Sequence, residues 1–272
     1  MKMRVKGLHA VALCAVALCA AGCDKMPGFP KPGPEVPRPD EVRDFKTLYA
    51  ENCAGCHGEN GRNGAALPLN NPAYLAIAGE ANLRAVTANG VKGTLMPAFA
   101  QSAGGMLTEE QVDALVKGML STWGKPSEFT GVVLPAYADS APGNATNGEK
   151  VFVAACARCH GTDGTGVKVA EGQAVPVDAT RDTILDASAL ALVSDQGLRS
   201  LILGGRPDEN VPDWRTYLTG PGAHALSSQE VNDVVAWIAS HRESAAGPPA
   251  QSTESDTAAK PSDTATTHKE TR

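Results

Sequence analysis

The stretches "CAGCH" (residues 53–57) and "CARCH" (residues 156–160) decide the fold of this chain. Each is a C-x-x-C-H motif, in which a pair of cysteines two residues apart is followed at once by a histidine. We predict a helix before each motif, over 41–52 and 147–155, and a glycine-rich loop after it. Two copies in equivalent surroundings indicate one structural unit used twice rather than a chance match.

The motif suits covalent attachment of haem c. Its two thiols can add across the two vinyl groups of one haem, and the histidine that follows is then placed under the iron as an axial ligand. We therefore predict two covalently bound haem c groups as cofactors. The predicted attachment residues are Cys53, Cys56, Cys156 and Cys159, and the predicted axial ligands are His57 and His160.

Two other readings of the motif fit less well. A redox-active dithiol would be expected beside strands, and the chain has no alternating apolar and polar runs that predict a sheet. A zinc site needs four ligands around one ion, whereas each half offers two cysteines and one histidine. A large bound group also accounts for the low aromatic content of 4% beside 42% hydrophobic residues, because it would supply core volume.

The two halves of the chain repeat one pattern. "LAIAGEANLRAVTANG" (75–90) aligns without a gap on "LALVSDQGLRSLILGG" (190–205), shifted by 115 positions. Closing amphipathic helices then begin near 108 and 227, and each start carries the spacing of a capping box, Thr108 with Gln111 and Ser227 with Glu230. The second half has extra residues, which we place within 167–182.

This layout resembles class I cytochrome c domains: helix, C-x-x-C-H, loop, axial-methionine segment, closing helix. Two such domains in tandem resemble the dihaem cytochromes c of bacterial respiratory chains. The resemblance implies an all-α fold with two domains, each wrapped round one covalently attached haem. We place domain 1 at 41–123, a linker at 124–143 and domain 2 at 144–243. Core contacts of the closing helices are expected at Leu115, Met119, Trp237 and Ile238.

The family's second axial ligand is a methionine in a loop before the last helix, commonly followed by proline. Met96 in "TLMPAF" (94–99) occupies that place. Histidine and methionine together raise the haem potential. Met119 lies within the closing helix, where a core role is expected, and Met106 is a weaker candidate for the ligand.

The second half has "ENVPDW" (209–214) at the same place, so Val211 aligns with Met96. None of the six methionines falls in this half. Three outcomes stay open: His224 as a replacement ligand, an open or water-bound sixth position, or a ligand from elsewhere, such as a lysine or a partner protein. The neighbouring acidic residues, either acid-base groups or solvated loop charges, are Asp208, Glu209 and Asp213.

The N-terminus predicts export. A basic start and a short apolar run make residues 1–22 a signal peptide. The sequence "AAGC" resembles a bacterial lipobox and predicts lipidation of Cys23, although Ala20 stands where such boxes usually carry leucine. Ordinary cleavage to a soluble periplasmic protein and an uncleaved anchor are the alternatives. Residues 23–40 predict a proline-rich tether, and residues 244–272 a disordered tail.

These features predict a membrane-tethered dihaem cytochrome c on the periplasmic side of a bacterial membrane. It would carry electrons between redox proteins such as a quinol-oxidising complex, a terminal oxidase or other cytochromes. We expect an electron-transfer protein rather than an enzyme. The alternative is a haem enzyme, or a gas- or peroxide-reactive protein, that uses an open sixth position on the second haem. The net charge of −6 argues against nucleic acid as a partner.

Overall fold

The computed structural model describes residues 33, 36–170, 173–174 and 182–242. These residues form helices joined by loops, and no strand occurs among them, so the predicted all-α fold is confirmed. Domain 1 contains η2 (Pro39–Glu41), α2 (Phe45–Asn52), α3 (Ala54–His57), α4 (Pro72–Asn89), η3 (Gln101–Ala103) and α5 (Glu109–Trp123). The linker holds η4 (Pro126–Phe129), and domain 2 contains α6 (Ala145–Ala155), α7 (Ala157–His160), α8 (Ala187–Ala191), α9 (Asp195–Gly204), η5 (Pro207–Glu209) and α10 (Ser228–Ala239).

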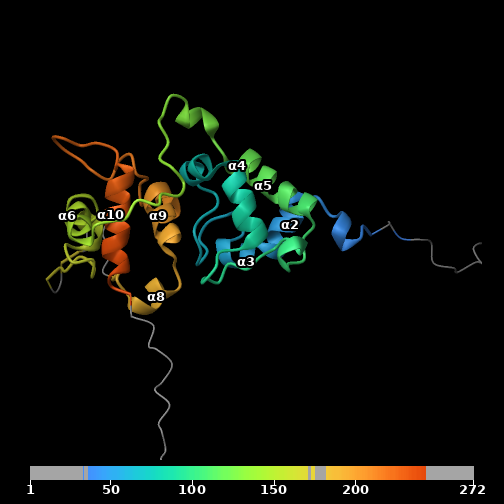
Figure 1. Ribbon diagram of the computed structural model, residues 1–272, viewed down its shortest axis with the longest axis horizontal. Helices are drawn as coiled ribbons and strands as arrows, with labels where there is room; N and C mark the ends of the chain where they lie inside the picture. The colour runs from blue at the N-terminus through green and yellow to red at the C-terminus, as the bar shows by residue number, and fades with distance from the viewer. Residues whose placement is uncertain (1–32, 34–35, 171–172, 175–181, 243–272) are drawn as a thin grey trace, which may run out of the picture.

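The closing helix of domain 1, α5, packs against α2 and α4 (Figure 1). Leu115 and Met119 lie in one buried cluster with Leu48 and Tyr49 of α2, as predicted for the closing helix. The helices approach closely at Gly118, where a Cβ atom would lie 2.2 Å from the Phe45 ring. A glycine at this position is therefore required by the packing.

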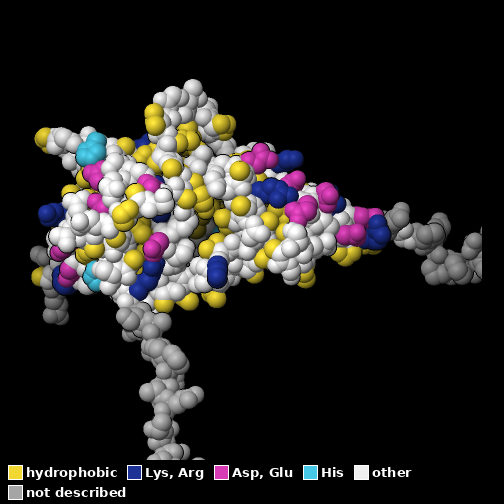
Figure 2. Space-filling view, in the orientation of Figure 1, with side chains coloured by type: hydrophobic (Ala, Val, Ile, Leu, Met, Phe, Trp, Pro, Cys, Tyr) yellow, Lys and Arg dark blue, Asp and Glu magenta, His cyan; other side chains and the backbone are white. Residues whose placement is uncertain are grey.

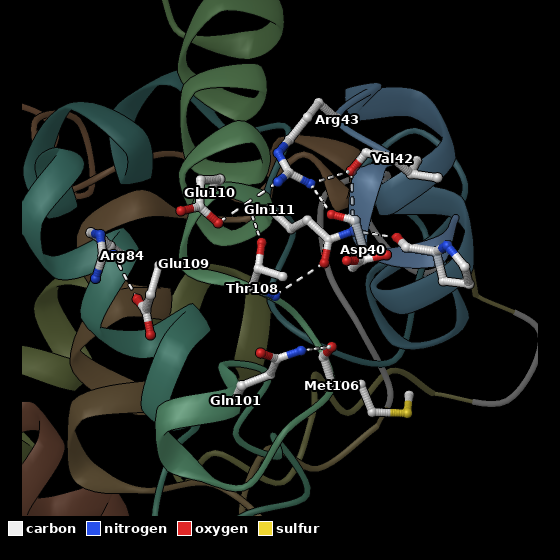
Figure 3. Close-up of polar contacts among 11 residues, drawn as sticks. Asp40, Val42, Arg43, Arg84, Gln101, Met106, Thr108, Glu109, Glu110 and Gln111 are labelled. Atoms are coloured by element: carbon white, nitrogen blue, oxygen red, sulfur yellow. Dashed lines mark hydrogen bonds and ion pairs between the residues drawn. The ribbon is translucent and has the colours of Figure 1, made fainter. Parts of the chain in front are cut away.

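The segment before α2 is fastened to the start of α5 (Figure 3). The Gln111 side-chain amide donates to the carbonyl oxygens of Pro39, at 2.8 Å, and Val42, at 3.1 Å. The side-chain oxygen of Gln111 accepts from the backbone N–H of Thr108, which completes the predicted capping box. The Gln111 side chain thus anchors the N-terminal segment on domain 1 and also caps the start of α5.

In domain 2, α10 packs across α6. The Phe152 and Trp237 rings lie 4.4 Å apart between their centroids, and Ile238 belongs to the same buried cluster. The crossing is close at Gly148, where a Cβ atom would lie 1.9 Å from the carbonyl oxygen of Asp233. The predicted core positions Trp237 and Ile238 are confirmed.

The linker is held against domain 2 by a buried arginine. Arg199 of α9 is 3% exposed. Its guanidinium donates to the carbonyl oxygens of Ala136 and Tyr137 in the linker, and to the side chains of Ser228 and Asn232 in α10. These hydrogen bonds satisfy a buried charge and at the same time fix the path of the linker.

The two domains share a packed boundary along α4 and α9 (Figure 1). Ala73 and Ile77 of α4 are buried in the hydrophobic cluster of domain 2 rather than in that of domain 1. Apolar side chains gather in the middle of the molecular face seen in Figure 2, whereas acidic and basic side chains are interspersed over α2 and α5. The domains are therefore joined by core packing as well as by the linker.

Several predicted features lie outside the described residues: the signal peptide at 1–22, the lipidation site Cys23, most of the tether at 23–40 and the whole tail at 244–272. In the part of the chain that is described, no helix has both the length and the apolar character needed to cross a bilayer.

Candidate functional site

Both C-x-x-C-H motifs fold in the same way. Cys53 ends α2 and begins the single turn of α3, and Cys156 does the same between α6 and α7. In each motif the backbone N–H of the histidine donates to the carbonyl oxygen of the first cysteine at 3.0 Å. Each turn ends at a glycine with positive φ, Gly58 at 80° and Gly161 at 76°. The backbone thus presents two cysteines and a histidine from one helical turn in each domain.

The environment of the first cysteine differs from that of a reactive dithiol. Burial, followed by the neighbouring Cys56, raises the pKa of the Cys53 thiol to about 12. Burial and Cys159 raise the pKa of Cys156 to about 12 in the same way. Redox-active C-x-x-C pairs rely on a lowered thiol pKa, so these sites do not suit that chemistry.

His57 fits an iron ligand. Its side chain is 8% exposed, and its Nδ1 lies 2.7 Å from the carbonyl oxygen of Leu67. A carbonyl can only accept, so Nδ1 carries the proton and Nε2 keeps its lone pair. Nε2 is buried and has no hydrogen-bond partner within the described structure. Burial also lowers the pKa of His57, which favours the neutral imidazole that a metal binds.

His160 has the same backbone position but a different set of partners. It is half-buried, and burial lowers its pKa. Its Nδ1 is the buried atom that lacks a partner among the described residues. The two domains can be aligned here, because the Asn70 N–H donates to the Gly61 carbonyl oxygen in domain 1 just as the Ile184 N–H donates to that of Gly164 in domain 2. In this alignment the residue that corresponds to Leu67, the partner of His57, is at position 181, which is not among the described residues.

Over the described ranges, no group of three or more His, Cys, Asp or Glu side chains could hold a metal ion. Within each motif, two cysteines and one histidine are one ligand short of the four that a structural zinc site uses.

Met96 and Val211 occupy equivalent loops, as predicted from the repeat. The Val91 N–H donates to the Met96 carbonyl oxygen at 3.0 Å, and the Arg206 N–H donates to that of Val211 at 3.0 Å. Loop 91–96 and loop 206–211 are each preceded by a glycine with φ of 67°. The same closing geometry thus carries a thioether in domain 1 and an aliphatic side chain in domain 2.

The competing methionines lie elsewhere. Met119 is 4% exposed within the core of domain 1, as expected. Met106 is 81% exposed and extends away from the polar contacts drawn around it in Figure 3. Met96 is half-buried in its loop.

His224 lies in an exposed loop before α10. Its Nε2 lies 3.0 Å from the Glu230 carboxylate, and its Nδ1 lies 3.1 Å from the Gly222 carbonyl oxygen. These two groups, with the carbonyl first, raise the pKa of His224. Both ring nitrogens therefore have partners, one in the same loop and one in the first turn of α10.

Near the sites, Asp208 lies in a setting that the sequence did not indicate, and Tyr217 was not identified from the sequence. The Asp208 side chain is 2% exposed, so it is not a solvated loop charge. Burial opposes its ionisation, but hydrogen bonds from the Asn63 N–H and Arg206 keep its pKa below the usual value. Tyr217 lies near the second attachment motif, and burial, then Cys156, raises its pKa. Tyr217 could have been noticed in the sequence as an aromatic residue in the loop before the closing helix, which is longer in domain 2 than in domain 1.

Comparison with known proteins agrees with the geometry. Residues 40–117 match the family model described as cytochrome C oxidase, cbb3-type, subunit III. Residues 145–242 match the model described as cytochrome c. Each match includes one C-x-x-C-H motif and the later loop, 91–96 or 206–211, which we call the distal loop of its domain.

Curated relatives match over about half of this chain. A cbb3-type cytochrome c oxidase subunit FixPc from Rhizobium leguminosarum bv. viciae is 30% identical over 48% of this chain and 45% of its own length. Subunit CcoP from Azospirillum sp. (strain B510) is 27% identical over 46% and 41%, respectively. Subunit FixP from Sinorhizobium medicae (strain WSM419) is 30% identical over 44% and 39%. The matched region thus spans less than half the length of each relative.

The family models, the shared backbone of the two motifs and the free imidazole nitrogen of His57 lead to one assignment. The chain consists of two tandem cytochrome c-type domains, which imply two covalently bound haem c groups.

Proposed function

We propose that this chain is a membrane-tethered dihaem cytochrome c that carries electrons between partners of a respiratory chain. The observation that supports it best is the pair of attachment motifs in two domains joined by a packed boundary. The relatives, which are subunits of cbb3-type oxidases, favour a terminal oxidase as one redox partner. A quinol-oxidising complex or another cytochrome would supply the electrons.

Within this proposal, the chain's own residues hold the cofactor. Cys53, Cys56, Cys156 and Cys159 would attach the two haem groups, and His57 and His160 would each bind the iron of one haem through a ring nitrogen. Met96 would supply a further iron ligand in domain 1. When bound, haem c supplies a reversible one-electron centre. Leu67 orients the His57 ring through its carbonyl oxygen, which accepts the Nδ1 proton and leaves Nε2 facing away from that bond.

A tether to the membrane is part of the proposal. Cys23 would carry the lipid, and the prolines of residues 27–39 would act as a semi-rigid spacer. The fastening of Pro39 and Val42 to Gln111 gives such a spacer a fixed end on domain 1. Replacing Cys23 by Ala should release the protein from washed membranes, while its haem content stays the same. If the variant remains bound to membranes, lipidation of Cys23 is wrong.

A second function is favoured by Val211, which stands where domain 1 has Met96 and offers no atom that binds iron. The sixth position in domain 2 could then be open and could react with a gas or peroxide. His224 is a less favoured ligand because both of its ring nitrogens have other partners. A ligand from another residue or protein is a further option.

One experiment separates the two functions. Optical spectra of the purified full-length chain are recorded in both redox states, with and without carbon monoxide. The reduced protein is then mixed with membranes that contain a cbb3-type oxidase, and its reoxidation is followed. Rapid reoxidation, together with two haem groups that do not bind carbon monoxide, supports electron transfer alone. Carbon monoxide binding by one haem, with peroxide consumption and no reoxidation by the oxidase, would overturn the proposal.

A further inference from the structure

The boundary between the domains brings loop 206–211 onto the attachment motif of domain 1. The Asn63 N–H donates to Asp208 Oδ2 at 3.0 Å. Arg206 Nη2 lies 3.5 Å from the Gly64 carbonyl oxygen and 3.4 Å from Asp208 Oδ2. An aspartate and an arginine of domain 2 thus contact two successive residues of domain 1, and we call them the loop clamp.

The contacted residues lie directly beside the first C-x-x-C-H motif. A Cβ atom on Gly64 would be 2.3 Å from the Cys56 carbonyl oxygen and 2.6 Å from the His57 carbonyl carbon. Asn63 has φ of 60°, a left-handed conformation that turns its N–H toward domain 2. The loop clamp therefore places two opposite charges next to the backbone that carries the axial histidine of domain 1.

The neighbouring polar contact explains how the loop is held there. The buried side-chain amide of Asn71 donates to the carbonyl oxygens of Gly204, at 3.0 Å, and Gly205, at 3.1 Å. A Cβ atom on Gly204 would lie 3.0 Å from this amide nitrogen, so α9 ends in close contact with the start of α4. The loop clamp begins at the next residue, Arg206.

Charges at this position are peculiar to the second domain. The repeat aligns Arg206 with Val91 and Asp208 with Gly93, so loop 91–96 has neither charge there. Stability alone is a weak reason for the difference, because a buried ion pair often contributes no more than apolar residues of the same shape. Arg206 Nε and Asp208 Oδ1 are, in addition, buried without a partner among the described residues, which is costly.

We propose that Arg206 and Asp208 are positioning residues that dock the distal loop of domain 2 on the first attachment motif and set the redox potential of the domain 1 haem. The proposal rests on the proposed electron-transfer function. The oxidised haem iron carries one more positive charge than the reduced iron. A nearby carboxylate stabilises the oxidised state and lowers the potential, and a guanidinium does the opposite. In this low-dielectric boundary both effects are stronger than at the surface.

The test is a redox titration of the full-length protein with chemical mediators, followed optically. Asp208→Asn should raise the potential of the domain 1 haem, Arg206→Gln should lower it, and the double variant should return toward the parent. Arg206→Lys, which keeps the charge, should leave the potential near that of the parent. The matched control is Arg84→Gln, because Arg84 forms an exposed ion-pair cluster with Glu109 and Asp113 in the same domain. No shift is expected there.

Opposite shifts support a direct electrostatic role. Shifts of the same sign in Asp208→Asn and Arg206→Gln would mean that the variants only loosen the boundary, and would overturn the proposal. An absence of shift in both would overturn it as well. Because chemical mediators replace the natural partners, this titration does not depend on the proposed function. If the chain exchanged no electrons with a respiratory partner, the proposed function would be wrong, but the measured potentials would still test the loop clamp. Should Arg206→Gln fail to fold, Asp208→Asn and Arg206→Lys decide the question.

Discussion

Loop 91–96 and loop 206–211 are closed by the same backbone hydrogen bond, but their side chains make different contacts. In domain 1 the loop holds Met96 half-buried, and its neighbours Lys92 and Gly93 are exposed. In domain 2 the loop has Val211 at the methionine position and holds Asp208 against domain 1. The repeat therefore keeps the loop hydrogen bond while the side chains differ: one loop presents the methionine that we propose as an iron ligand, and the other contacts the neighbouring domain.

The largest expected effect concerns the feature that the two domains share. Replacing Cys53 and Cys56 by Ala should reduce the haem content from two groups per chain to one, because no thioether can form in domain 1. The pair Cys156 and Cys159 should give the same loss in domain 2. Haem per chain is measured by the pyridine haemochrome method. Cys23→Ala serves as the matched cysteine control and should keep both groups; two groups in either double variant would contradict the assignment.

Exchange of the distal residues tests the difference between the loops. Met96→Ala should abolish the weak far-red charge-transfer band of a methionine-ligated oxidised haem, and Val211→Met should create a second such band. The potential of the altered haem should fall in the first variant and rise in the second. Optical spectroscopy and redox titration measure both. Met106→Ala is the control, since this side chain is 81% exposed; loss of the band there would show that Met106 is the ligand.

The helices before the motifs also differ at equivalent positions. Phe152 is fully buried against Trp237, whereas Tyr49 donates its hydroxyl to the Gly58 carbonyl oxygen at 2.9 Å. Phe152→Ala should lower the free energy of unfolding by about 3–5 kcal/mol, since it leaves a cavity. Tyr49→Phe removes one hydrogen bond and should cost about 1 kcal/mol. Urea denaturation of the haem-loaded protein measures both, and equal losses would refute the difference in packing.

The smallest effect concerns pH. The folded-state pKa of Asp208 lies below its ordinary value, so its contribution to stability is present above the ordinary carboxyl pKa. That contribution is lost as the pH falls through the lower, folded-state pKa. Arg206 and Glu209 face the same carboxylate region and are the other charged groups there. Asp208→Asn should therefore flatten the acid side of a melting-temperature profile, and Glu59→Gln, at an exposed position, should leave it unchanged.

Local signals made much of this fold predictable. The two motifs depend on five consecutive residues, and the caps at Thr108 and Ser227 depend on a residue three positions further on. Both kinds of feature therefore appear in the sequence as fixed spacings. The repeat register, read from glycines and apolar positions, also aligned Met96 with Val211, and the shared loop hydrogen bond agrees with it.

Contacts between distant segments were not predictable in the same way. Arg84 and Arg199 occupy the same place in the repeat, yet the first forms exposed ion pairs with α5 and the second is buried beneath the linker. The difference depends on whether a linker passes over the helix, which no local pattern encodes. The burial of Asp208 has the same origin, because its partner Asn63 is 145 positions away in the chain.

The side-chain amide of Asn71 bears on whether the two domains could be separated. In domain 1 its oxygen accepts from the Tyr74 N–H at the start of α4, while its nitrogen serves two carbonyl groups at the end of α9. Separating the halves would leave those carbonyl groups unpaired and would expose Ala73 and Ile77. The two halves repeat one pattern, yet each depends on the other for polar pairing and for the burial of apolar side chains, so neither can be lifted out unchanged as an independent unit.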